Sequence, residues 1–158
     1  MKTFLTALVM GLSGAIAVSV SFSAGWPTWV MFIAWVSYFL FGRDLISTCL
    51  SLLQICAGIL MGISIQLSAG ILSPVLAGIA FPLTVFLLIG SLAYLSQIKG
   101  LNNIPAWFIG LIIFFGVHPE IKAVPVMKLI IPITAGFAFA MLNDYGVKSI
   151  NRLKTTQQ

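Results

Sequence analysis

The sequence predicts an all-α polytopic membrane protein with six transmembrane helices, and two observations lead to that prediction. Only 7% of the 158 residues are charged and 60% are hydrophobic, whereas about a quarter of the residues in a soluble domain are charged. The apolar residues also gather into six stretches. Because burying a charge in hydrocarbon costs several kcal/mol, a chain so poor in charge is suited to a lipid bilayer. We therefore expect a single transmembrane domain over residues 1–158.

The six apolar stretches define the expected spans. We place them at residues 4–22, 26–41, 47–67, 72–95, 104–117 and 126–146, with a polar tail at 147–158. A full crossing needs about 20 residues, so the second and fifth spans are short. The small residues Ser68-Ala69-Gly70 are interpreted as the loop between the third and fourth spans. Ser21-Phe22-Ser23-Ala24 could also end a cleaved secretory signal, although a chain with five further spans usually keeps its first helix.

The basic residues indicate the orientation. Counting them between the expected spans gives six on the side of the N-terminus and two on the other side: Lys2, Arg43, Lys99, Lys148, Arg152 and Lys154 against Lys122 and Lys128. Cytoplasmic loops carry the excess of Lys and Arg, so both termini are expected in the cytoplasm. The net charge of +5 is scattered along the chain, and no nucleic-acid partner is expected.

The chain also aligns with itself when it is shifted by 78 residues. Residues 5–66 then match residues 83–144 at nine positions, including Pro27-Thr28-Trp29 with Pro105-Ala106-Trp107 and Ala57-Gly58 with Ala135-Gly136. The halves, about 4–67 and 72–146, hold three spans each. An odd number of spans makes the second half enter the membrane from the opposite side, so we expect an inverted repeat, which is typical of transporters.

The two short spans carry the candidate solute site. Both open with Pro-x-Trp, and paired short segments in corresponding positions of a repeat indicate a binding site. An alternative is that the tryptophans only mark the two membrane interfaces. The candidates for a solute path are Pro27, Trp29, Tyr38, Gln54, Pro105 and Trp107.

Small residues predict where helices pack closely. Gly58 and Gly62 are four residues apart in the third span, and Gly136 and Ala140 repeat that spacing in the sixth. Such small-xxx-small faces let the backbones of membrane helices approach each other. We interpret them as packing positions.

Several chemistries find no support in the residues. The chain has one His, two Cys and three acidic residues, all scattered, so we expect no enzyme, no cofactor and no metal site. Asp144 is placed to pair with Lys148, four residues further on. Because no ionisable group is expected near the middle of the bilayer, proton or ion coupling is not expected either.

The apolar motifs resemble those of a known family. Gly14 to Ser19, Trp29 to Phe39, Pro105 to Gly110 and Pro132 to Phe137 make the chain similar to the YcdZ-like family of small bacterial inner-membrane proteins of unknown function. The resemblance covers nearly the whole chain. It implies a multi-pass protein of the bacterial cytoplasmic membrane and supplies no catalytic or ligand residues.

Two functions follow as hypotheses. The first is a channel or facilitative transporter for a small neutral solute or an anion, consistent with an inverted repeat and with a homo-oligomer in the lipid bilayer. The alternative is a non-transporting scaffold or accessory subunit that acts through helix–helix contacts on its small-residue faces. The sequence does not identify the solute.

Overall fold

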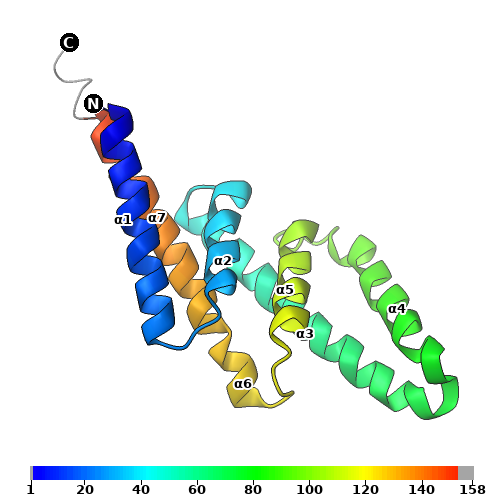
Figure 1. Ribbon diagram of the computed structural model, residues 1–158. Coiled ribbons are helices and arrows are strands. Elements are labelled where there is room, and N and C mark those ends of the chain that lie inside the picture. The colour runs from blue at the N-terminus through cyan, green and yellow to red at the C-terminus, as the bar shows by residue number, and fades with distance from the viewer. Residues whose placement is uncertain (1, 153–158) are drawn as a thin grey trace. The chain divides into compact units, whose positions relative to one another are not determined.

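The computed structural model describes residues 2–152, which are helical and contain no strand. The elements are α1 (Lys2–Ser23), α2 (Thr28–Phe41), α3 (Leu45–Leu76), the 3₁₀ turn η1 (Ala77–Ile79), α4 (Ala80–Leu95), α5 (Ile104–Val117), α6 (Ala123–Lys128) and α7 (Ile130–Arg152) (Figure 1). The prediction of an all-α protein is confirmed. Three helical stretches among the described residues, Lys2–Ser23, Leu45–Leu95 and Ala123–Arg152, are long and apolar enough to cross a membrane.

The segments expected as the short second and fifth spans form two apolar helices of 14 residues each, α2 and α5. The loop expected at Ser68-Ala69-Gly70 is wrong, because α3 continues through it to Leu76. Serine and alanine are tolerated in a helix flanked by apolar residues, so their small size did not end it. The helix contains Pro74 and ends at Leu76. Ala77 then adopts a left-handed backbone conformation at the start of η1, and the chain reverses there.

The sixth apolar stretch is interrupted near its start. Pro132 has no N–H and cannot bond to the carbonyl of Lys128, which is the last residue of α6. The next bond, from the Ile133 N–H to the Leu129 carbonyl, is long at 3.4 Å. Beyond this break α7 runs to Arg152, so it includes the first part of the expected tail. Residues 153–158 of that tail lie outside the described residues.

The chain divides into two compact units, residues 1–48 with 127–158 and residues 49–126. The first unit contains α1, α2 and α7, with α7 antiparallel to α1 and parallel to α2 (Figure 1). Its core holds Ala17, Met31, Ala34, Ile133 and Phe137, all almost fully buried. The second unit is one continuous segment of the chain, whereas the first joins the two ends of the chain.

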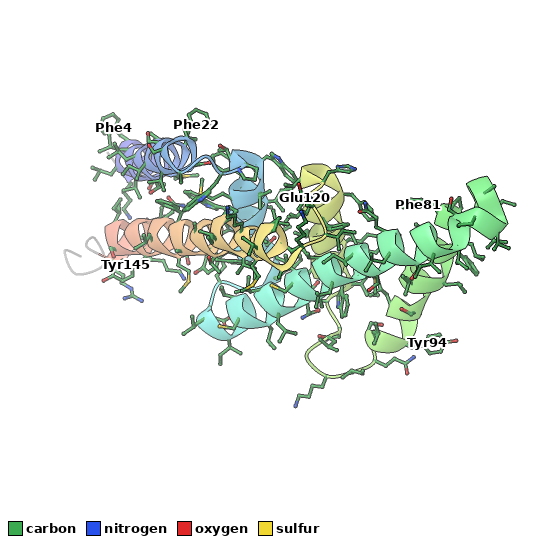
Figure 2. The ribbon with its side chains drawn as sticks, turned by 90° about the horizontal axis from the view of Figure 1, so that it is seen from below. Phe4, Phe22, Phe81, Tyr94, Glu120 and Tyr145 are labelled. Carbon is green, nitrogen blue, oxygen red and sulfur yellow. The ribbon has the colours of Figure 1, made fainter. Side chains whose placement is uncertain are left out.

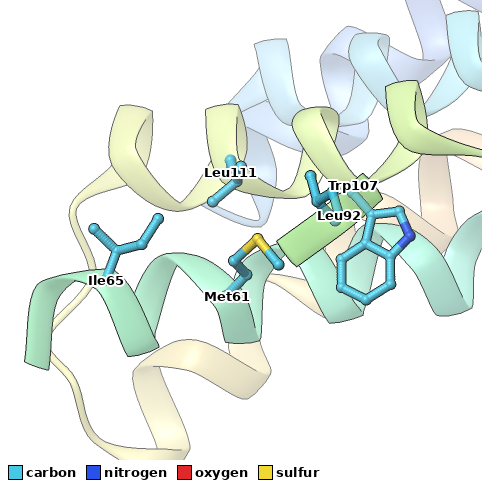
Figure 3. Packing of buried hydrophobic residues seen from close by; sticks show 5 residues of the cluster. All are labelled: Met61, Ile65, Leu92, Trp107 and Leu111. Atoms are coloured by element: carbon cyan, nitrogen blue, oxygen red, sulfur yellow. The ribbon is translucent and has the colours of Figure 1, made fainter. Parts of the chain in front are cut away.

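The second unit contains most of α3 together with α4 and α5. Here α3 runs parallel to α5 and antiparallel to α4 (Figure 1). Its core is the cluster of Met61, Ile65, Leu92, Trp107 and Leu111, to which all three helices contribute (Figure 3).

Large apolar side chains also cover the outside of the helices. Phe4 and Phe22 on α1, Phe81 and Tyr94 on α4, and Tyr145 on α7 are all exposed (Figure 2). In water such a surface would be an aggregation liability, whereas in a bilayer it faces lipid. The outer surface therefore agrees with the three apolar stretches in indicating a membrane protein.

Candidate functional site

The two Pro-x-Trp turns begin helices as expected, but their tryptophans differ. Pro27 is the N-cap of α2, and Pro105 lies in the first turn of α5, where a missing N–H costs no bond. Trp29 is 38% exposed, whereas Trp107 is only 6% exposed. The indole N–H of Trp107 donates to the carbonyl of Leu101 at 3.1 Å. Trp107 is thus part of the core of its unit.

Gln54 on α3 is engaged by the protein itself. Its side chain is buried, and its Oε1 accepts the backbone N–H of Asn103, the N-cap of α5, at 2.7 Å. Its Nε2 donates to the carbonyl of Leu50 at 3.3 Å. Gln54 therefore supplies a hydrogen bond at the start of a helix that is distant in sequence. Its role as a solute ligand stays a prediction.

Tyr38 is one of three residues that contact the buried carboxylate of Asp144. Its hydroxyl donates to Asp144 Oδ2 at 3.0 Å, and Lys148 Nζ lies 2.6 Å from the same oxygen. Arg43 pairs with Asp144 Oδ1, and its guanidinium lies over the ring of Phe39. The predicted pair of Asp144 with Lys148 is confirmed, whereas the contacts of Tyr38 and Arg43 were missed. A buried acidic residue needs several hydrogen-bonding or oppositely charged partners. The presence of Asp144 in an apolar helix was therefore a sign that residues distant in sequence would contact it.

The glycines predicted for packing do bring helix backbones together. A side-chain carbon on Gly58 would overlap the carbonyl oxygen of Trp107, so α3 lies directly against α5. A side-chain carbon on Gly136 would likewise overlap the carbonyl oxygen of Met31, which places α7 directly against α2. Gly62 faces the ring of Phe114. Ala140 is fully buried on the same helix as Gly136.

An apolar pocket lies in each unit. The pocket of the first unit has a volume of about 310 Å³ and is lined by α1, α2 and α7: Met10, Gly14, Phe32, Trp35, Val36, Phe39 and Asn143. The pocket of the second unit has a volume of about 330 Å³ and is lined by α3, α4 and α5: Ile65, Phe81, Val85, Ile89, Phe108, Leu111, Ile112 and Phe115. The two pockets thus have similar sizes and are both formed by three helices.

Asn143 gives the first pocket its single amide group. The residue is only 4% exposed, and its Oδ1 has no hydrogen-bond partner within the described part of the chain. Buried polar atoms are almost always hydrogen-bonded, so this unpaired acceptor is unusual. No local sequence pattern predicts this burial, because the pocket forms only when three distant segments pack together.

The long apolar helices and their exposed apolar side chains indicate a helical membrane protein. Residues 7–148 match the family described as "protein of unknown function (DUF1097)", and the chain belongs to that family. No curated protein and no solved structure is significantly similar to it. The match confirms the expectation of a family of unknown function, and the resemblance to YcdZ-like proteins stays a prediction.

Proposed function

We propose that the protein is a channel or facilitative transporter for a small neutral solute. In this proposal α1 to α5 and the α6–α7 stretch make six membrane passages, arranged as two inverted halves of three helices. Short α2 and α5 would lie at equivalent places in the two halves. Inverted repeats of this kind are typical of transporters, because they offer related surfaces to the two sides of the membrane.

The observation that supports the proposal most is the likeness of the two units. The alignment by 78 residues pairs α1 with α4, α2 with α5, and α3 with α7. In each unit the paired helices have the same relative directions (Figure 1). Gly58 and Gly136, which the alignment matches, both press on a backbone carbonyl near the start of the short helix. Ile65 and Asn143, also matched, both line a pocket.

The polarity of the structure favours a neutral solute over an anion. Both pockets are lined almost wholly by apolar side chains. An anion would need free N–H groups at a helix start. At the start of α5, however, the N–H of Asn103 is bonded to Gln54 and the N–H of Ala106 to the carbonyl of Asn103. Those donors are therefore already used within the protein.

We further propose that the protein lies in the bacterial cytoplasmic membrane with both termini in the cytoplasm. The distribution of Lys and Arg along the chain supports this orientation. In the proposal the partners are the bilayer and a second copy of the chain, and the function is not enzymatic. The alternative of a scaffold loses part of its basis, because Gly58 and Gly136 are occupied by contacts inside the chain.

The test is solute entry into proteoliposomes, followed by light scattering with a panel of small neutral solutes and small anions. We expect faster entry of at least one neutral solute than into empty liposomes and no acceleration of the anions. Trp29→Ala should change the rate more than Trp26→Ala, because Trp29 lies on the short helix and Trp26 precedes it. No acceleration of any neutral solute by correctly reconstituted protein would refute the proposal.

A further inference from the structure

In the first unit, one buried carboxylate holds Arg43 and Lys148 next to each other. Asp144 is only 2% exposed; its Oδ1 pairs with Arg43, and its Oδ2 lies 2.6 Å from Lys148 Nζ. The hydroxyl of Tyr38 also donates to Oδ2. Both basic side chains, in contrast, are 49% exposed. The carboxylate is therefore engaged from inside the protein, whereas the two cations reach the surface.

This end of the first unit carries an excess of positive charge. Arg152 lies four residues beyond Lys148 on the same face of α7. Lys2 begins α1, and that end of α1 lies beside the C-terminal end of α7 (Figure 1). Against these three cations and Arg43, the described residues at this end offer the carboxylates of Asp144 and Asp44, and that of Asp44 already accepts two hydrogen bonds at the start of α3. A surface of this kind attracts a negatively charged ligand.

Packing of three helices does not require the charged cluster. The offset of 78 residues matches Asp144 with Gln66 and Lys148 with Gly70, so the second unit has no charge at these positions. Replacing a buried ion pair by apolar groups is often neutral or stabilising, because charges lose their hydration on burial. One carboxylate also balances only one of two adjacent cations. The ion pairs therefore fit a role in fixing the positions of two exposed cations better than a role in stability.

We propose that Arg43 and Lys148, positioned by Asp144, bind the phosphate of an anionic phospholipid at this end of the first unit. An arginine has five N–H donors and a lysine three, so each has donors beyond the one that it gives to Asp144. Phosphate oxygens accept strong, charge-assisted bonds from such donors. The inference goes beyond the proposed function, because a lipid can bind here whether or not the protein transports a solute.

The apolar surroundings of the two cations favour a lipid over a phosphate from the water. The guanidinium of Arg43 lies 4.9 Å from the centroid of the Phe39 ring, and Phe39 is itself exposed. Leu40 on the same helix is exposed, as is Leu142, which lies less than two turns before Lys148 on α7. Because exposed apolar side chains of a membrane protein face acyl chains, the cations lie where head groups are found. Basic sites between membrane helices bind anionic head groups in this way.

The lipid preference of the full chain tests the inference directly. The protein in a neutral detergent is titrated with phosphatidylglycerol and with phosphatidylcholine of the same acyl chains, and native mass spectrometry gives the dissociation constant of the first bound lipid. We expect phosphatidylglycerol to bind about thirtyfold more tightly, since each of the two cations contributes about fivefold. Equal affinities for the two lipids would overturn the proposal.

Competition separates the lipid from a soluble phosphate. Glycerol phosphate has the same charged group without acyl chains, so at equal concentration it should not displace phosphatidylglycerol from the protein. Displacement of the lipid by glycerol phosphate would overturn the assignment to a phospholipid and indicate a site for phosphate from the water.

Variants that each remove one positive charge locate the site. Arg43→Gln and Lys148→Gln should each lower the affinity for phosphatidylglycerol about fivefold and leave that for phosphatidylcholine unchanged. Lys122→Gln is the matched control, because Lys122 is also paired with a carboxylate, that of Glu120, but belongs to the second unit. It should keep the preference of the unmodified protein. An equal loss in all three variants would show a response to net charge alone and refute the site.

Asp144→Asn separates the positions of the cations from their charge. The variant keeps Arg43 and Lys148 and makes the protein more positive, so attraction by overall charge alone predicts tighter binding of phosphatidylglycerol. Under the inference the affinity falls instead, because the two cations lose the carboxylate that holds them together. An unchanged or higher affinity would refute the role of Asp144. The comparison of the two lipids on the unmodified protein stands even where a variant does not fold, and lipid binding without any solute flux would refute transport and leave this inference intact.

Discussion

Replacement of Gly136 by alanine is expected to destabilise the first unit, because α7 touches the backbone of α2 there. The new Cβ would overlap the carbonyl oxygen of Met31 and lie 2.8 Å from the Cβ of Ala34. A backbone carbonyl cannot rotate away as the end of a side chain can, so the two helices must separate. Overpacking of this kind costs about 1–3 kcal/mol, and the upper part of that range applies to a backbone obstacle.

The gain in helix propensity offsets part of that cost. Alanine is better than glycine in a helix interior by about 1 kcal/mol, so the net loss for Gly136→Ala should be about 2 kcal/mol. Gly11→Ala on α1 is the matched control, because nothing lies near its new Cβ. It should be neutral or stabilised by up to about 1 kcal/mol.

The free energies of unfolding are to be measured in mixed micelles by titration with a denaturing detergent, with helix content followed by circular dichroism. Gly58→Ala should behave like Gly136→Ala, since its Cβ would overlap the carbonyl oxygen of Trp107. Gly62→Ala should cost less, because it meets only the side chain of Phe114. A Gly136→Ala protein as stable as Gly11→Ala would show that α2 and α7 do not pack through this glycine.

Three further predictions concern polar groups. Asp144→Asn should lower stability by about 2 kcal/mol, because it removes the charge-assisted bonds to two basic partners that are half-exposed; unfolding in the same detergent titration measures it. Asn143→Ile should raise stability by about 1–3 kcal/mol, because an unpaired buried acceptor is removed; a lower melting temperature would contradict this. The backbone N–H and the hydroxyl of Ser47 bond to the carboxylate of Asp44 and lower its pKa. The cap should therefore contribute fully above the ordinary carboxyl pKa and be lost as the pH falls through the lowered value, so the difference in melting temperature between wild type and Asp44→Asn should shrink from pH 7 to pH 3.

Local patterns in the sequence predicted the helices well where a strong signal marked their ends. Residues 104–117 were placed correctly, because Pro105 and the polar residues around His118 bound an apolar run. The end of α3 was misplaced, because small residues in an apolar environment remain compatible with a helix. The helix ends at Leu76, directly before Ala77 adopts a left-handed backbone conformation. Helix ends therefore follow backbone constraints more closely than residue size.

The candidate site was less predictable, because its contacts join distant parts of the chain. Asp144 and Lys148 are four residues apart, so their pairing followed from helix geometry. Tyr38 lies 106 residues from the carboxylate to which it donates, and no local pattern encodes such a contact. The same holds for the burial of Asn143, which arises only when α1 and α2 pack beside α7.

Each of the two units combines helices from both halves of the chain. Each unit takes two helices from one half of the chain and its glycine-bearing third helix from the other half, α7 with α1 and α2 and α3 with α4 and α5. Under the proposed repeat, neither half can bury its short helix without the other, because Gly136 presses on Met31 and Gly58 on Trp107. Under the proposed repeat, Gly58 and Gly136 therefore occupy the same packing position in the two copies. The position matched by Ile65 and Asn143 lies in a pocket wall, outside these backbone contacts, and is free to differ. Under the proposed repeat, the two copies therefore share their glycine contacts between helices, while the walls of the two pockets differ.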